Sequence, residues 1–193
     1  LKEPTYPLVD VNLKGVLNTI KLAHYSFKRD GVRGSIVITS SATAYAPEWS
    51  LPVYSGLKLA LIGLVRSLRH KLVLENISIN AVVPACTETP LVGPQFLKPI
   101  KDAGLPISSA RHVGAALVFS TIAEESRRVE LYAEEPIENL QKSRSWNGRV
   151  ILTLGDTYTE LEEKLGDMRP QWFGEKNAVL TRKQQAATDY REL

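Results

Sequence analysis

The chain has 193 residues, of which 44% are hydrophobic, so it is long and apolar enough to bury one sizeable core. Its 24 basic and 21 acidic residues are spread along the chain and leave a net charge of only +3, which argues against nucleic-acid binding. The single cysteine, Cys86, excludes an internal disulfide and a cysteine-rich metal site, and it suits a reducing, cytoplasmic location.

Two further features bear on how the chain is organised. No run of residues reaches the ~18 apolar positions that a membrane span needs, so we expect no membrane partner. The chain begins with Leu1, and its only methionine is Met168. We therefore expect these residues to be part of a longer translated product.

The first predicted element is a long amphipathic helix. Apolar residues recur at three- and four-residue spacings from Pro7 to Asp30, and Gly31 follows as a stop signal. Asn12 lies near the start of this run. An exposed helical asparagine usually has no function, so Asn12 on its own predicts none.

A short apolar strand at 34–40 follows, and Ser41 comes directly after it. Nearly continuous apolar runs are typical of parallel strands that are covered on both faces. Open α/β sheets bind ligands beyond the carboxyl ends of their strands, so the Ser41 hydroxyl is well placed for chemistry.

Pro52 then opens a second long helix, predicted to reach about residue 75. Tyr54 and Lys58 are four residues apart, which places them on one face of this helix, about one turn from each other. A neighbouring ammonium favours the phenolate, so Tyr54 is a candidate acid or base near neutral pH. A Tyr-x-x-x-Lys pair is weak by itself, and its context must support the interpretation.

The second strand is predicted at 77–83 and ends at Pro84. A Pro- and Gly-containing stretch, 91–106, is typical of a loop or a short lid helix. Ser108 and Ser109 look like caps for the helix that follows. None of the three histidines has neighbours suited to a metal site.

The last third alternates between polar and apolar composition. Residues 124–146 are charge-rich and predict an exposed insertion beyond the core. A third strand is predicted at 149–154, followed by a polar helical tail at 157–193. Trp172 and Phe173 are the expected apolar anchor of that tail.

The order of Asn12, Ser41, Tyr54 and Lys58, each in its place relative to the strands, resembles the short-chain dehydrogenase/reductase family. The resemblance implies an α/β fold, a Rossmann-type doubly wound parallel sheet, of which residues 1–193 form the C-terminal half as a single domain. It implies a hydride transfer between NAD or NADP and a carbonyl or alcohol carbon of a small organic substrate.

The same resemblance implies a role for each side chain. Tyr54 transfers the proton, and Ser41 orients the reacting oxygen. Lys58 acidifies Tyr54 and binds the nicotinamide ribose, so Tyr54 and Lys58 also count as cofactor-binding residues. Asn12 distorts its helix and holds a water that links Lys58 to solvent.

The residues after the second strand resemble the family's loop that contacts the nicotinamide carboxamide. Pro84, Thr87 and Thr89 are the candidate cofactor-binding residues there, although Thr89 before a proline also fits a simple turn. Ala85 stands where the family usually has glycine, and we expect a shift in loop geometry and no block.

The family's Gly-rich turn, which seats the cofactor pyrophosphate, is not among these residues. NAD and NADP therefore stay open alternatives, as does the substrate, and activity of this piece alone is doubtful. One rival function keeps the Tyr-Lys pair but makes the protein an epimerase or dehydratase. Another rival is a truncated, non-catalytic protein that keeps the helices at 8–29 and 54–75 for association. If the protein is an oxidoreductase, we also expect it to form a homo-oligomer through these two helices.

Overall fold

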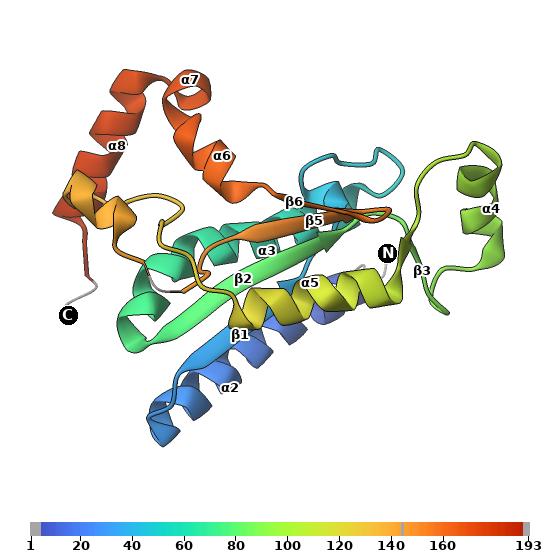
Figure 1. Cartoon of the computed structure of the whole chain (residues 1–193), viewed down its shortest axis with the longest axis horizontal. Helices are drawn as coiled ribbons and strands as arrows, with labels where there is room; N and C mark the ends of the chain where they lie inside the picture. The colour runs from blue at the N-terminus through green and yellow to red at the C-terminus, as the bar shows by residue number, and fades with distance from the viewer. Residues whose placement is uncertain (1–4, 144, 191–193) are drawn as a thin grey trace.

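The computed structural model describes residues 5–143 and 145–190, which form a twisted sheet with helices on both sides (Figure 1). Its strand order is β1-β2-β5-β6. The strands β1 (Gly34–Thr39), β2 (Ile77–Pro84) and β5 (Val150–Leu154) are parallel. The predicted strands at 34–40, 77–83 and 149–154 are thus confirmed, and so is the α/β fold class with a parallel sheet.

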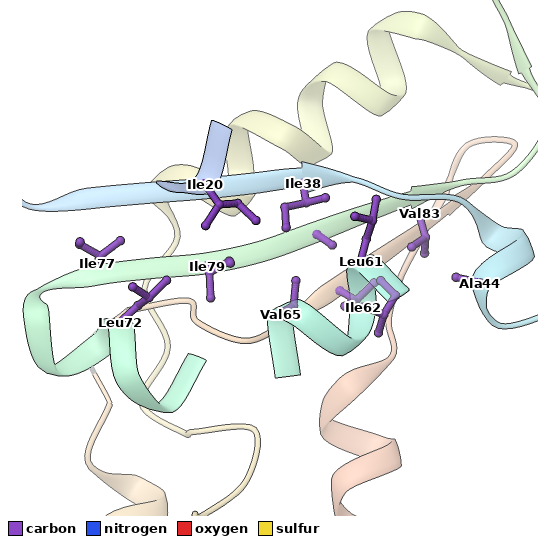
Figure 2. Packing of buried hydrophobic residues seen from close by; sticks show 12 residues of the cluster. Ile20, Ile38, Ala44, Leu61, Ile62, Val65, Leu72, Ile77, Ile79 and Val83 are labelled. Atoms are coloured by element: carbon purple, nitrogen blue, oxygen red, sulfur yellow. The ribbon is translucent and has the colours of Figure 1, made fainter. Parts of the chain in front are cut away.

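Alternation along β2 shows how both faces of the sheet are covered. Ile77, Ile79, Ala81 and Val83 face a core formed with α2 (Gly15–Asp30) and α3 (Pro52–Leu72), as Figure 2 shows for most of them. Val82 points the other way, into a smaller cluster with α5 (Ala110–Ile122). Because β2 is covered on both faces, its side chains are almost all buried, as expected of a central parallel strand.

The first predicted helix contains a π-helical turn near its start. It consists of α1 (Pro7–Val9), the π-helical turn η1 (Asp10–Lys14) and α2. Gly31, in the left-handed conformation at φ 63°, ends α2, and this is the stop that its position predicted. The second long helix, α3, runs into the 3₁₀ turn η3 (Val73–Glu75).

The remaining elements are short. They are η2 (Ala42–Ala44), β3 (Thr87–Glu88), α4 (Pro94–Asp102), β4 (Ser108–Ser109), η4 (Ile137–Gln141), β6 (Thr157–Glu160), α6 (Glu162–Asp167), α7 (Arg169–Phe173) and α8 (Glu175–Ala187). The predicted short helix within 91–106 is α4, and the predicted cap of α5 is Ser109, whose Oγ accepts from His112 N at 3.1 Å.

Three predictions for the last third are wrong. Residues 157–160 are not helical: they form β6, antiparallel to β5. Trp172 and Phe173 do not anchor the tail, because they are 56% and 38% exposed and contact each other edge to face. The charged segment 124–146 is not simply exposed, since Val129 and Ala133 are buried in it.

The strand β1 lies at one edge of the sheet in the part of the chain that the structure describes. It pairs there with β2 alone, from Gly34 opposite Ile77 to Thr39 opposite Val82. Among the described residues, no helix is both long enough and apolar enough to cross a membrane.

Candidate active site

The parallel strands β1 and β2 end side by side, so the polar residues that follow each strand lie at the same, carboxyl end of the sheet. Ser41 follows β1, is buried, and is the N-cap of η2. Its Oγ accepts hydrogen bonds from Thr43 N at 3.2 Å and from Thr43 Oγ1 at 3.1 Å. The Ser41 hydroxyl is therefore held in place at the position that open α/β sheets use for ligands.

Helix α3 brings Tyr54 and Lys58 to the same carboxyl end of the strands. Lys58 Nζ lies 5.4 Å from the centre of the Tyr54 ring and donates a hydrogen bond to Thr39 O at 3.2 Å. The hydroxyl of Ser40 donates to Lys58 O at 2.8 Å. The side-chain ammonium and the backbone carbonyl of Lys58 thus both bond the first turns of α3 to the end of β1.

Lys58 is a nearly buried ammonium group, with 8% of its surface exposed. Burial lowers its pKa from the usual 10.5. Its ammonium lies beside the Tyr54 ring, so a cationic and a phenolic side chain adjoin at the carboxyl end of β1.

Asn12 lies in the π-helical turn η1, so the helix is distorted where the resemblance implied a distortion. Its Nδ2 donates to Leu8 O at 3.1 Å. The turn packs against α3, the helix of Tyr54 and Lys58. Single π-turns within α-helices are frequent at functional sites.

The loop after β2 is folded by local hydrogen bonds. Thr87 Oγ1 donates to Ala85 O at 2.9 Å, and β3, which begins at Thr87, pairs with β4. Thr89 O accepts from Val92 N at 3.0 Å, so this residue sits in a turn while its side chain is half-buried. Beyond it, α4 projects from the end of the sheet (Figure 1).

Two buried hydroxyls beside this loop escaped the sequence analysis. Ser108 Oγ and Thr153 Oγ1 have no hydrogen-bond partner in the described part of the chain. Both residues bond to the loop through their backbones, Ser108 N to Cys86 O and Ala85 N to Thr153 O, each at 2.9 Å. Both residues are almost completely shielded from solvent, Ser108 at 1% and Thr153 at 0% exposure, so these oxygens lie behind the loop and not on its surface.

Cys86 lies in the loop after β2. Cys86 is half-buried, and burial raises the pKa of its thiol, which disfavours the reactive thiolate. Within residues 5–143 and 145–190, no group of histidine, cysteine or acidic side chains could hold a metal ion.

Comparison with known proteins gives consistent matches. The protein-family model described as "short chain dehydrogenase" matches residues 2–99. "Short-chain dehydrogenase/reductase prx4" of Penicillium roqueforti is 54% identical over 191 residues, which cover 99% of this chain and 57% of the relative. "Short-chain dehydrogenase/reductase ATR7" of Stachybotrys chlorohalonatus is 51% identical and is covered to 60%. The chain thus spans less than two thirds of the length of these relatives.

Solved structures show a similar fold. The 3-ketoacyl-(acyl-carrier-protein) reductase of Brucella melitensis, complexed with NADH, superposes with a TM-score of 0.56 at 22% identity, over 76% of this chain and 55% of the other. A putative 2-deoxy-d-gluconate 3-dehydrogenase of Agrobacterium tumefaciens with bound NADP gives 0.54 at 22% identity, over 58% and 49%. At 22% identity, these two structures show that the fold is similar and no more than that.

Proposed function

This chain belongs to the short-chain dehydrogenase/reductase family, and from that premise we propose that it is part of an NAD- or NADP-dependent oxidoreductase that interconverts a carbonyl and an alcohol. The observation that carries the proposal is the position of Tyr54, directly beside the nearly buried Lys58 at the carboxyl end of β1.

Each side chain has a task in the proposed proton transfer. Tyr54 gives a proton to the carbonyl oxygen in reduction and takes it back in oxidation. Ser41 donates a hydrogen bond that orients the same oxygen. Lys58 places its ammonium beside the Tyr54 ring, and Asn12 connects Lys58 to solvent for proton exchange.

The cofactor would supply or accept the hydride when bound. Lys58 would hold the ribose next to the nicotinamide, since its ammonium lies at the strand end beside Tyr54. Pro84, Thr87 and Thr89 would contact the carboxamide side.

The proposal extends to assembly. Helices α2 and α3 cover one sheet face, and they also carry exposed apolar side chains, among them Leu22 at 67% and Leu59 at 49%. We propose that the full-length protein is a cytoplasmic homo-oligomer that associates through these helices. Light scattering on that protein tests this, and a monomer at micromolar concentration would refute it.

The test of function uses the full-length gene product that contains this chain. We expect it to change the redox state of NADH or NADPH in step with the reduction of a compound from a panel of small aldehydes and ketones. An epimerase or dehydratase would convert a substrate with no net change in the cofactor. If no nicotinamide cofactor binds, the non-catalytic alternative replaces the proposal.

A further inference from the structure

A buried carboxylate far from Tyr54 in the sequence contacts one residue on each of the two segments that carry the proposed site, Tyr45 after Ser41 and Arg66 on α3. Glu162, in the first turn of α6, is 2% exposed. Its Oε1 accepts from Tyr45 Oη at 2.5 Å and from Arg66 Nη2 at 2.7 Å, while its Oε2 accepts from Arg66 Nε at 2.8 Å. Arg69 Nη1 adds a longer contact of 3.5 Å.

Tyr45 belongs to the segment that Ser41 begins. Ser41 is the N-cap of η2, and Tyr45 is its C-cap, so one short turn joins them. The following residues, 46–51, are all exposed. The Tyr45 side chain is therefore the last one in this segment that is not exposed, and beyond it the backbone N of Glu48 donates to Ser55 Oγ at 3.3 Å.

Arg66 belongs to the helix that carries the proton-transfer pair. It lies two turns beyond Lys58 on α3, and α3 is continuous from Pro52 to Leu72. The Arg66 guanidinium also lies 5.9 Å from the centre of the Tyr45 ring. One carboxylate thus bonds the Ser41 segment to the helix of Tyr54 and Lys58.

The charges around Glu162 favour this arrangement. Burial acts to raise the pKa of Glu162, but hydrogen bonds from Arg66 and Tyr45 and the nearby guanidinium charges outweigh it, so its pKa lies below the usual value. The carboxylate is therefore ionised at neutral pH, and its bidentate pairing with Arg66 is geometrically strict.

We propose that Glu162 is a positioning residue, which holds Ser41 at a fixed distance from Tyr54 by binding Tyr45 and Arg66 together. The inference rests on the proposed function of Ser41 and Tyr54. It assigns a task to α6, which lies outside the residues matched by the family model. The shared carboxylate sets alignment and makes no contact with the reacting atoms.

The test compares Tyr45→Phe and Glu162→Gln with Glu163→Gln in the full-length protein. Tyr45→Phe removes one hydroxyl and keeps the ring. It should therefore fold even if Glu162→Gln does not, since Glu162→Gln leaves Arg66 without its carboxylate, whereas Arg69 keeps its pairing with Glu130. Glu163 is the matched control, since it is the next residue and also pairs with two guanidinium groups, those of Arg127 and Arg149, each at 2.7 Å.

Misalignment of reacting groups lowers turnover more than binding. We expect Tyr45→Phe to reduce kcat about tenfold, with KM and the cofactor Kd within about twofold, and the control to stay within about twofold in all three. Amide hydrogen exchange in 42–51 should be faster in Tyr45→Phe and unchanged in the control.

The outcomes separate the two proposals. An active wild type with an unchanged kcat in Tyr45→Phe overturns the positioning role alone. Equal losses of kcat in Tyr45→Phe and Glu163→Gln also overturn it, because they indicate general destabilisation. A full-length protein without cofactor-dependent turnover overturns the proposed function, and the role of Glu162 with it.

Discussion

Lys58 carries a nearly buried ammonium group, and burying its charge lowers the free energy of unfolding. Below its lowered folded pKa, Lys58 is charged in both the folded and the unfolded chain, so the whole desolvation penalty is present at neutral pH. As the pH rises through the folded pKa toward the unfolded value of 10.5, the folded state loses its proton first and the penalty shrinks.

We therefore expect Lys58→Met, which keeps length and removes charge, to unfold at a higher urea concentration than wild type at neutral pH while losing turnover. The difference should narrow as the pH approaches 10.5. Urea unfolding of both proteins at neutral pH and near pH 10.5 measures this difference in stability. A Lys58→Met protein that is less stable at neutral pH would mean that the bond to Thr39 O outweighs the desolvation penalty.

At the scale of elements, β2 is the strand on which both layers of helices rest. Ile79 is completely buried there, within the core of Figure 2. We expect Ile79→Ala to reduce the free energy of unfolding by about 2–5 kcal/mol, because it removes buried methyl groups and leaves a cavity. Ile122→Ala, at a position that is 70% exposed on α5, should change it by about 0.5 kcal/mol or less. Denaturant unfolding of both variants checks the contrast.

The strand β1 has one edge that pairs with no other strand in the described part of the chain. Its centre, 35–39, is uncharged and rich in β-branched residues, a composition that invites pairing between molecules. We expect the isolated 193-residue chain to associate, and Ser35→Lys to reduce that association by placing a charge at the edge. Analytical ultracentrifugation of the two proteins measures it, and equal association would locate the contact elsewhere.

The elements also show what local patterns can predict. The strands and the helix carrying Tyr54 and Lys58 follow from apolar periodicity and from start and stop residues, which act over a few positions. The strand β6 does not, since it depends on pairing with β5. The cluster around Glu162 could not be predicted either, because Tyr45 and Glu162 are 117 residues apart and each looks like an ordinary polar surface residue in its own neighbourhood.

At the scale of the whole molecule, the 193 residues lack the Gly-rich turn that seats a cofactor pyrophosphate. Contacts at Tyr54, Lys58 and Thr89 alone would reach only one end of the cofactor. We expect no rise in the melting temperature of the isolated chain with millimolar NAD or NADP. A ligand at 100 times its Kd adds about 2.7 kcal/mol, so a site that binds is detectable, and a clear rise would show that this part holds a complete cofactor site.

The central claim is that Tyr54 transfers the proton, and its most direct test is the turnover of Tyr54→Phe in the full-length protein under conditions where chemistry limits the rate. Tyr25→Phe is the matched control, since Tyr25 is 63% exposed on α2. We expect Tyr54→Phe to lower kcat by about 10²–10⁴-fold while cofactor Kd changes by about threefold or less, because the phenol supplies a proton and little binding surface. A Tyr54→Phe protein that retains more than about a tenth of the wild-type kcat would contradict the account.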